Sequence, residues 1–271
     1  MKKIIILLAT IILSVVSLYA QEQAKYRITY DSEGDLRTPS KSRQYVRWAL
    51  DIGNTTAAFY CPAQRMLEEE LKNTKSGNSL ADVYKLSDKY KHRQKLQILW
   101  HSPQKNQFTY MNNMFKNIKY SDTLPKIEWQ LCEGEATVCE YKCKIAKGTV
   151  FGRTWTVYYT KEIPLSYGPW ILGGLPGLVL KAFDSDNLFI FEAVGIENIT
   201  DGSLVKMTRT EKAIDCKTRK KYVELRNHKD ASPDTFLQSL TGIESKSYDE
   251  NGKPMNYAER LNEVAFNYLD K

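Results

Sequence analysis

Three of the five cysteines lie close together in the sequence, and they could form a disulfide or bind a soft metal ion. Cys132, Cys139 and Cys143 are separated by seven and four residues, whereas Cys61 and Cys216 are distant. Zinc sites usually combine cysteines two to four residues apart with histidines, and no histidine is near, while thiolates also suit copper(I). In an oxidising compartment, thiols pair more often than they bind metal. We therefore expect a disulfide that includes Cys132, Cys139 or Cys143 and no metal site, with at least one of the five thiols free, paired with another chain or acting as a ligand.

The sequence has no motif of a known enzyme class. It lacks the Gly-x-Ser-x-Gly of a nucleophile elbow, the His-Glu-x-x-His of a zinc peptidase and the glycine spacing of a nucleotide-binding loop. His92, His101 and His228 stand in charged or loop-like contexts. Asp184 and Asp186 are better explained as turn residues than as an acid-base pair. A cysteine-histidine pair assembled only by the fold is the remaining catalytic alternative. We expect a protein that is not an enzyme and that holds no cofactor.

The segment from Gly168 to Leu180, GPWILGGLPGLVL, places four glycines and two prolines in an apolar run. Pro176-Gly177 predicts a type II turn, in which glycine supplies the positive φ. Gly173 and Gly174 would let another backbone come close. The segment is not a phosphate-binding loop, because it lacks the Gly-Lys-Ser/Thr ending.

Two interpretations of this segment remain open. It could form the lip of a site for a ligand or partner, with candidate binding residues Trp155, Trp170, Gly173, Gly174, Leu175, Pro176 and Gly177. Alternatively, it is a kinked crossing between two strands, with Leu175 and Leu178 filling the core. We favour the crossing, because Pro-Gly turns have a sufficient local explanation.

The motifs around this segment occur in a recognisable order. They are Trp129, Tyr141 with Cys143, Gly152 with Arg153 and Trp155, Thr160 to Pro164, and Gly168 to Val179. In this order they resemble the GLPGLI family, exported proteins of Bacteroidetes-type bacteria whose function is largely unassigned. Val179 replaces the final isoleucine of the family motif, and Glu140 stands where the family often has glycine. The strand order is also similar to that of periplasmic lipoprotein carriers, in which a curved antiparallel sheet holds an apolar ligand beneath helices.

The first twenty residues have the pattern of an export signal. Lys2-Lys3 precede an apolar run from Ile4 to Val16, and Ala20 suits a cleavage site. The run is shorter than the roughly 20 residues of a spanning helix. We expect a signal peptide over 1–20, cleaved after Ala20, and a single GLPGLI-type domain over 21–271 in the periplasm or secreted.

Hydrophobic periodicity predicts a sheet-dominated α+β fold, with a curved antiparallel sheet and flanking helices. The resemblance to lipoprotein carriers implies that this sheet is of their half-barrel type. Helices are expected at 62–72, 79–92, 233–240 and 255–269. Two early strands are expected at 26–30 and 43–52. Later strands are expected at 96–100, 107–111, 127–131, 138–145, 154–160, 178–183, 188–194 and 204–210, with a hairpin turn at 184–187.

Charge gives little support for nucleic-acid binding. The whole chain has 39 Lys and Arg against 32 Asp and Glu. The segment from Lys206 to Lys229 contains nine basic and three acidic residues, and it fits a solvated surface better than a binding patch. We therefore expect a binding, carrier or accessory protein that acts on an apolar ligand or an outer-membrane protein, without catalysis. The alternatives are an interaction partner of an outer-membrane transporter with no small ligand, and a metal-handling protein that uses its cysteines.

Overall fold

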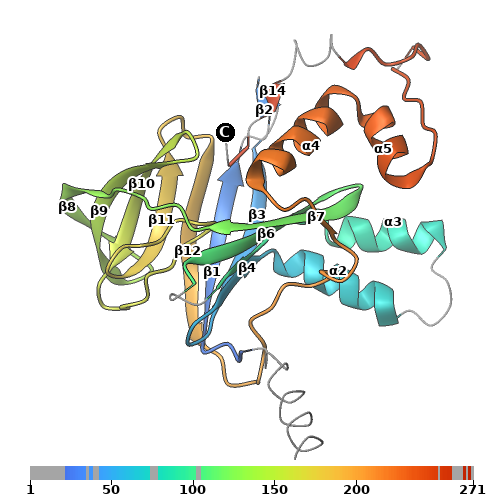
Figure 1. Cartoon of the computed structure of the whole chain (residues 1–271). Coiled ribbons are helices and arrows are strands. Elements are labelled where there is room, and N and C mark those ends of the chain that lie inside the picture. The colour runs from blue at the N-terminus through green and yellow to red at the C-terminus, as the bar shows by residue number, and fades with distance from the viewer. Residues whose placement is uncertain are drawn as a thin grey trace, which may run out of the picture.

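Twelve strands form one curved sheet in the computed structural model of this chain (Figure 1). The structure describes residues 22–34, 37–38, 43–73, 79–101, 105–249, 251–257, 265–266 and 268–269. The strand order is β13-β7-β6-β5-β4-β3-β1-β12-β11-β10-β9-β8, and every neighbouring pair is antiparallel except β13 with β7. The predicted α+β class, with a curved antiparallel sheet and flanking helices, is confirmed. The predicted signal peptide, residues 1–20, lies outside the described residues.

The strands and helices follow one another along the chain in a fixed order. They are β1 (Tyr26–Gly34), β2 (Arg37–Thr38), β3 (Gln44–Ile52), β4 (Ala57–Tyr60), α2 (Pro62–Asn73), α3 (Leu80–Lys89), β5 (Gln97–Trp100), β6 (Gln107–Met114), β7 (Lys116–Thr123), β8 (Gln130–Val138), β9 (Tyr141–Val150), β10 (Arg153–Thr160), β11 (Leu178–Asp184), β12 (Phe189–Asn198), β13 (Ile214–Asp215), α4 (Arg219–Ala231), α5 (Pro233–Thr241) and β14 (Ala265–Phe266). The short strands β2 and β14 pair with each other outside the large sheet.

The two faces of the sheet are covered differently. The inner face carries the main core, in which Trp48 stacks on Phe59 at 4.8 Å and Tyr222 of α4 packs on Tyr110 and Tyr120 of the β6–β7 hairpin. On the opposite, outer face of β3 to β5, the segment 199–208 supplies Val205 to a second, smaller core. Figure 1 shows α4 and α5 on one side of the β6–β7 hairpin and α2 and α3 on the other.

Most of the predicted elements are present. The helices expected at 62–72, 79–92 and 233–240 are α2, α3 and α5, and the hairpin through 184–187 joins β11 to β12. Local chemistry explains the helix boundaries. Ser79 and Asp82 form a capping box at the start of α3, and Gly242 ends α5 with a left-handed φ of 73°. None of the helices that the structure describes is long and apolar enough to span a membrane.

Three element predictions are corrected by the structure. The strand expected at 138–145 is interrupted by a two-residue hairpin turn, because Cys139 and Glu140 both adopt positive φ, as a type I′ turn requires. The segment 204–210 forms no strand and contributes only an isolated bridge from Leu204 to Gln23. The helix expected at 255–269 lies largely outside the described residues, and within it Ala265–Phe266 form β14.

Candidate functional site

The turn at Pro176-Gly177 differs from the predicted type II turn. The N–H of Gly177 donates to the carbonyl of Leu175 at 2.8 Å, which closes a three-residue γ-turn around Pro176, and Gly177 is not among the residues with positive φ. A side chain at Gly177 would instead meet the carbonyl oxygen of Thr160 at 2.0 Å. Glycine is needed here because β11 begins to pair with β10 at this point, with Thr160 opposite Leu178.

Positive φ occurs earlier in the segment, at Trp170 (55°) and Gly174 (84°). For a bulky residue such as tryptophan this backbone conformation is uncommon and strained. The close approach predicted for Gly173 and Gly174 is confirmed only at Gly173, where an added Cβ would lie 2.7 Å from the carbonyl oxygen of Ser166 and 2.8 Å from the ring of Trp100. At Gly174 the nearest atom to an added Cβ is the indole nitrogen of Trp129, at 3.9 Å. The segment is thus fixed by contacts with its neighbours as well as by its own turns.

The glycine segment packs into the core. Five of the seven candidate binding residues are buried: Trp155, Trp170 and Leu175, which are at most 3% exposed, and Gly173 and Gly177. The other two, Gly174 and Pro176, are exposed. Indole N–H groups satisfy two of its carbonyls, since Trp100 donates to Trp170 at 3.1 Å and Trp129 donates to Gly173 at 2.9 Å. This geometry supports the kinked crossing, with Leu175 and Leu178 in the core as expected.

The predicted disulfide is not formed in the structure. All five cysteines are free thiols. Across the β8–β9 ladder, Cys132 faces Ile145 and Cys143 faces Ala136, while Cys139 lies in the hairpin turn, so no two of the three are cross-strand partners. Burial raises the pKa of Cys143 to about 11, with Glu162 adding to the effect, and burial also raises the pKa of Cys139. These two thiols are therefore protonated near neutral pH and are weak nucleophiles.

Two buried carboxylates have structural roles. Asp184 accepts from Arg153 at 2.7 Å and from the N–H of Phe189 at 2.8 Å, and both side chains of the Arg153–Asp184 pair are at most 2% exposed. Asp184 thus serves as the predicted turn residue. Asp51 binds Arg27 through both carboxylate oxygens, at 2.7 and 3.0 Å. Within the described residues, no group of three or more His, Cys, Asp or Glu side chains could hold a metal ion.

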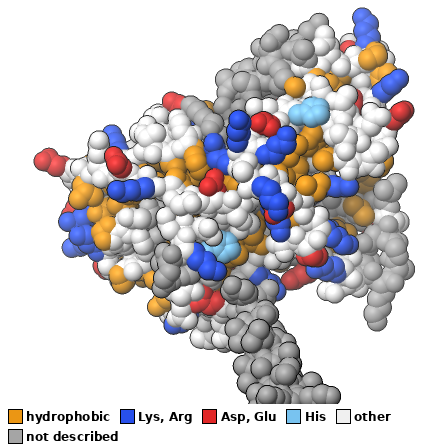
Figure 2. Space-filling model, in the orientation of Figure 1, with side chains coloured by type: hydrophobic (Ala, Val, Ile, Leu, Met, Phe, Trp, Pro, Cys, Tyr) orange, Lys and Arg blue, Asp and Glu red, His pale blue; other side chains and the backbone are white. Residues whose placement is uncertain are grey.

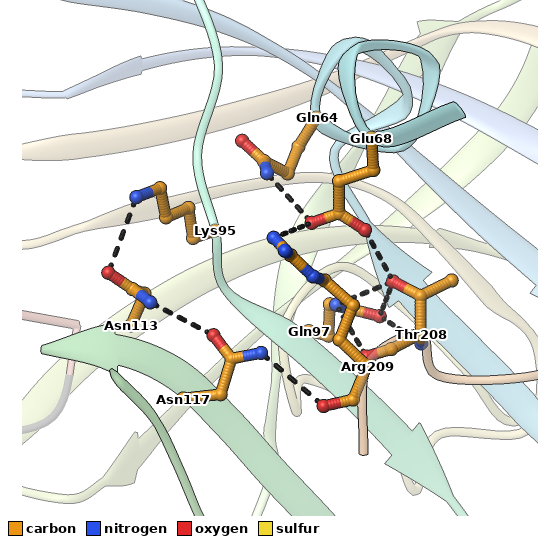
Figure 3. Close-up of polar contacts among 8 residues, drawn as sticks. All are labelled: Gln64, Glu68, Lys95, Gln97, Asn113, Asn117, Thr208 and Arg209. Atoms are coloured by element: carbon orange, nitrogen blue, oxygen red, sulfur yellow. Dashed lines mark hydrogen bonds and ion pairs between the residues drawn. The ribbon is translucent and has the colours of Figure 1, made fainter. Parts of the chain in front are cut away.

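A polar cluster on the outer face, which sequence analysis did not identify, lies where α2, the start of β5, the β6–β7 hairpin and the 199–213 segment meet (Figure 3). We call it the outer polar network. Its members are Gln64, Glu68, Lys95, Gln97, Asn113, Asn117, Thr208 and Arg209.

The base of the outer polar network is buried. Glu68 accepts from Gln64 at 2.8 Å, from the hydroxyl of Thr208 at 3.2 Å and from Arg209 at 3.4 Å. Gln97 accepts from the N–H of Thr208 at 2.8 Å, which fixes the 199–213 segment to β5. Glu68, Gln64 and Gln97 are each no more than 7% exposed. The base is therefore well ordered by its own hydrogen bonds.

The rim of the network is accessible and more loosely bonded. Lys95 donates to Asn113 at 3.3 Å, Asn113 donates to Asn117 at 3.0 Å, and Asn117 donates to the carbonyl of Arg209 at 3.4 Å. Lys95 and Arg209 are exposed and the two asparagines are half-buried. Arg209 has a φ of 58°, and Phe115, at the tip of the hairpin between the asparagines, has a φ of 66°. Strained residues of this kind gather at functional sites.

Basic groups outnumber acidic ones at this rim. Partial burial lowers the pKa of Lys95, and the positive charges of Arg93 and Arg209 lower it further, while Glu68 opposes them. Charges are interspersed on the molecular face in Figure 2, where basic side chains lie among acidic and apolar ones. The excess of positive charge at the rim comes from Lys95 and Arg209, with Arg93 nearby.

One region of this chain is similar in sequence to a domain of N-glycanases. A family model described as the N-terminal domain of N-glycanase peptides matches residues 90–221, just under half of the chain. No curated protein matches the chain by sequence. The matched region contains six of the eight members of the outer polar network, all except Gln64 and Glu68, and also the glycine segment.

Similarity to solved structures is distant. Two crystal structures of PNGF-II share 18% identity with this chain, cover 74% of it and give a TM-score of 0.46. The structure of MucB in complex with MucA(peri) shares 8% identity with this chain and gives a TM-score of 0.30. The match covers 68% of this chain and 57% of that chain. A putative outer membrane lipoprotein-sorting protein domain from Vibrio parahaemolyticus shares 6% identity with this chain and gives a TM-score of 0.27. The match covers 66% of this chain and 86% of that chain. This chain spans about a third of the PNGF-II chains, with 32% covered.

Proposed function

We propose that this protein is an exported, non-catalytic accessory protein that binds the glycan part of glycoproteins through the outer polar network. The observation that carries the proposal is the network itself, in which two half-buried amides and two exposed cations surround a buried carboxylate. The family-model match supports it, because that model describes the N-terminal domain of N-glycanases. Export rests on the signal-like residues 1–20.

The chemistry of the network suits a polyhydroxylated ligand. A sugar hydroxyl both donates and accepts hydrogen bonds, and the side-chain amides of Asn113 and Asn117 also do both. The contacts that now join Lys95 to Asn113 and Asn117 to Arg209, at 3.3 and 3.4 Å, are longer than most N–H···O bonds. Exchange of these two contacts for bonds to a ligand therefore costs little.

The inner face of the sheet fits an apolar carrier function less well. Trp155, Leu172 and Leu175 belong to the main core there and are at most 3% exposed. A large apolar ligand would have to displace these side chains, at a cost set by the close packing of protein interiors. We therefore place ligand binding on the outer face.

Isothermal titration calorimetry with a neutral, asparagine-linked glycopeptide tests this proposal. Wild-type protein should bind the glycopeptide and not the same peptide without its glycan. Asn117→Ala removes a group that bonds to both Asn113 and Arg209, and we expect binding to weaken by about tenfold, the effect of one or two hydrogen bonds.

Ser121→Ala is the matched control, because Ser121 lies on β7 with Asn117, four residues away on the same face. The control should bind as wild type does. Equal binding of glycopeptide and bare peptide, or equal losses in Asn117→Ala and Ser121→Ala, would reject the outer polar network as a glycan site.

A further inference from the structure

The rim of the outer polar network has two cationic side chains that are only weakly engaged. Within the described part of the chain, the ammonium of Lys95 bonds only to the amide oxygen of Asn113, at 3.3 Å, and has no carboxylate partner. The guanidinium of Arg209 meets Glu68 at 3.4 Å, and its side chain is 52% exposed. Both cations therefore keep donors available for a further partner.

The surroundings of these cations strengthen their preference for an anion. Arg93 lies close enough to lower the pKa of Lys95, and it is held in place because it donates to the carbonyls of Ser87 and Tyr90 at 2.8 Å each. Glu68 is the carboxylate in this set, it is buried, and Gln64, Thr208 and Arg209 already bond to it. The accessible rim therefore carries net positive charge.

The backbone position of Arg209 is fixed by its neighbours. Arg209 adopts a left-handed φ of 58°, and the neighbouring Thr208 is bonded to Gln97 at 2.8 Å. Asn117 also donates to the carbonyl of Arg209 at 3.4 Å, so the β6–β7 hairpin contacts this turn from the other side. The point from which the Arg209 side chain extends is therefore set before a ligand binds, which lowers the entropy cost of binding.

We propose that the rim binds an oxyanion of the ligand, a carboxylate, phosphate ester or sulfate ester, between Lys95 and Arg209. This inference rests on the proposed function, because it assigns the charged class of glycan that the outer polar network prefers. Lys95 supplies a compact charge and Arg209 supplies directional donors, and the second N–H of each asparagine amide can complete the oxyanion's hydrogen bonds.

The test compares three forms of one glycopeptide: neutral, sialylated and sulfated. At low salt, we expect at least one anionic form to bind ten- to a hundredfold more tightly than the neutral form, the range for hydrogen bonds to charged groups. The difference should shrink as salt rises. Lys95→Gln and Arg209→Gln should each remove most of this preference, so that each variant binds the anionic forms within about twofold of its own affinity for the neutral form.

Lys212→Gln is the matched control, since Lys212 is an exposed lysine of the same segment and its loss changes the net charge equally. The control should keep the preference. Equal affinity for all three forms, or the same loss in Lys212→Gln as in Lys95→Gln, overturns the oxyanion site.

Inorganic sulfate alone, followed by NMR titration, separates this inference from the proposed function. Shifts at Lys95 in the wild type, together with shifts at Arg209 that Lys95→Gln abolishes, support the oxyanion site even if no glycopeptide binds. Neutral glycopeptide binding without any anionic preference supports the glycan site and rejects the oxyanion site.

Discussion

Replacement of Gly177 with alanine places a methyl group against the backbone of β10. The new Cβ would lie 2.0 Å from the carbonyl oxygen of Thr160, 2.7 Å from its carbonyl carbon and 3.2 Å from the Cα of Lys161. All three neighbours are backbone atoms, so the clash cannot be relieved by the movement of a side chain. The contact occurs where Thr160 pairs with Leu178 and β11 begins.

The size of the effect follows from this geometry. Ordinary contacts begin near 3.4 Å, so the carbonyl of Thr160 has to move by about 1.4 Å from its 2.0 Å contact. Forced movement of this kind in a packed interior costs about 1–3 kcal/mol, and we expect about 3 because the obstacle is backbone in a sheet. For a chain of this size, that loss lowers Tm by about 6–12 °C.

Urea and thermal unfolding of Gly177→Ala measure this cost. Gly195→Ala is the control, because Gly195 lies in β12 and its nearest neighbour to an added Cβ is Thr29 at 3.9 Å. The control should unfold near wild type or slightly later, since alanine restricts the unfolded chain. A Gly177→Ala variant with wild-type stability would refute the crossing geometry. A stable variant that loses glycopeptide binding would make the glycine segment a recognition element.

Two further predictions concern buried polar groups. Asp184→Asn should destabilise the fold by about 3–5 kcal/mol in urea unfolding, because it leaves the buried Arg153 without its carboxylate partner. The control Asp186→Asn, at an exposed position two residues away, should cost under about 0.5 kcal/mol. Similar losses in both variants would contradict the role of the ion pair. Iodoacetamide should label Cys143 slowly at neutral pH and faster as the pH rises toward the pKa of this thiol, about 11. Peptide mapping without reduction should find no disulfide among Cys132, Cys139 and Cys143, and a crosslinked pair would restore the disulfide prediction.

Local patterns were sufficient to predict much of the fold. The alternation in residues 154–160 and the apolar runs at 178–183 and 188–194 each correspond to a strand of the sheet. The helix that begins at Pro62 and the helix that ends at Gly242 follow from signals within a few residues of each boundary. In each case the chemistry that sets the structure is close in sequence.

Failures occurred where a local pattern fits two conformations. Pro176-Gly177 suits a type II turn and also the γ-turn that forms, and only the approach of Thr160 decides between them. The turn at Cys139–Glu140 has no glycine, so nothing in the sequence marks its positive φ values. The helix α4 lies in a strongly basic segment whose apolar positions gave no clear helical stripe.

The outer polar network could not be predicted because its partners are far apart in sequence. Gln97 and Thr208 are 111 residues apart, and Glu68 and Thr208 are 140 apart. The available signal was the pair Asn113 and Asn117, which flank the tip of a hairpin that sequence analysis predicted only as a single strand at 107–111. Pairing across that hairpin is what brings the two amides together.

The most direct test of the account is to map the bound neutral glycopeptide on ¹⁵N-labelled protein by NMR. We predict that the largest shifts occur at the side-chain amides of Asn113 and Asn117 and at the backbone of Thr208 and Arg209. Shifts confined to the indole N–H groups of Trp155 and Trp170, or to the glycine segment, would contradict the account and place the ligand on the inner face of the sheet.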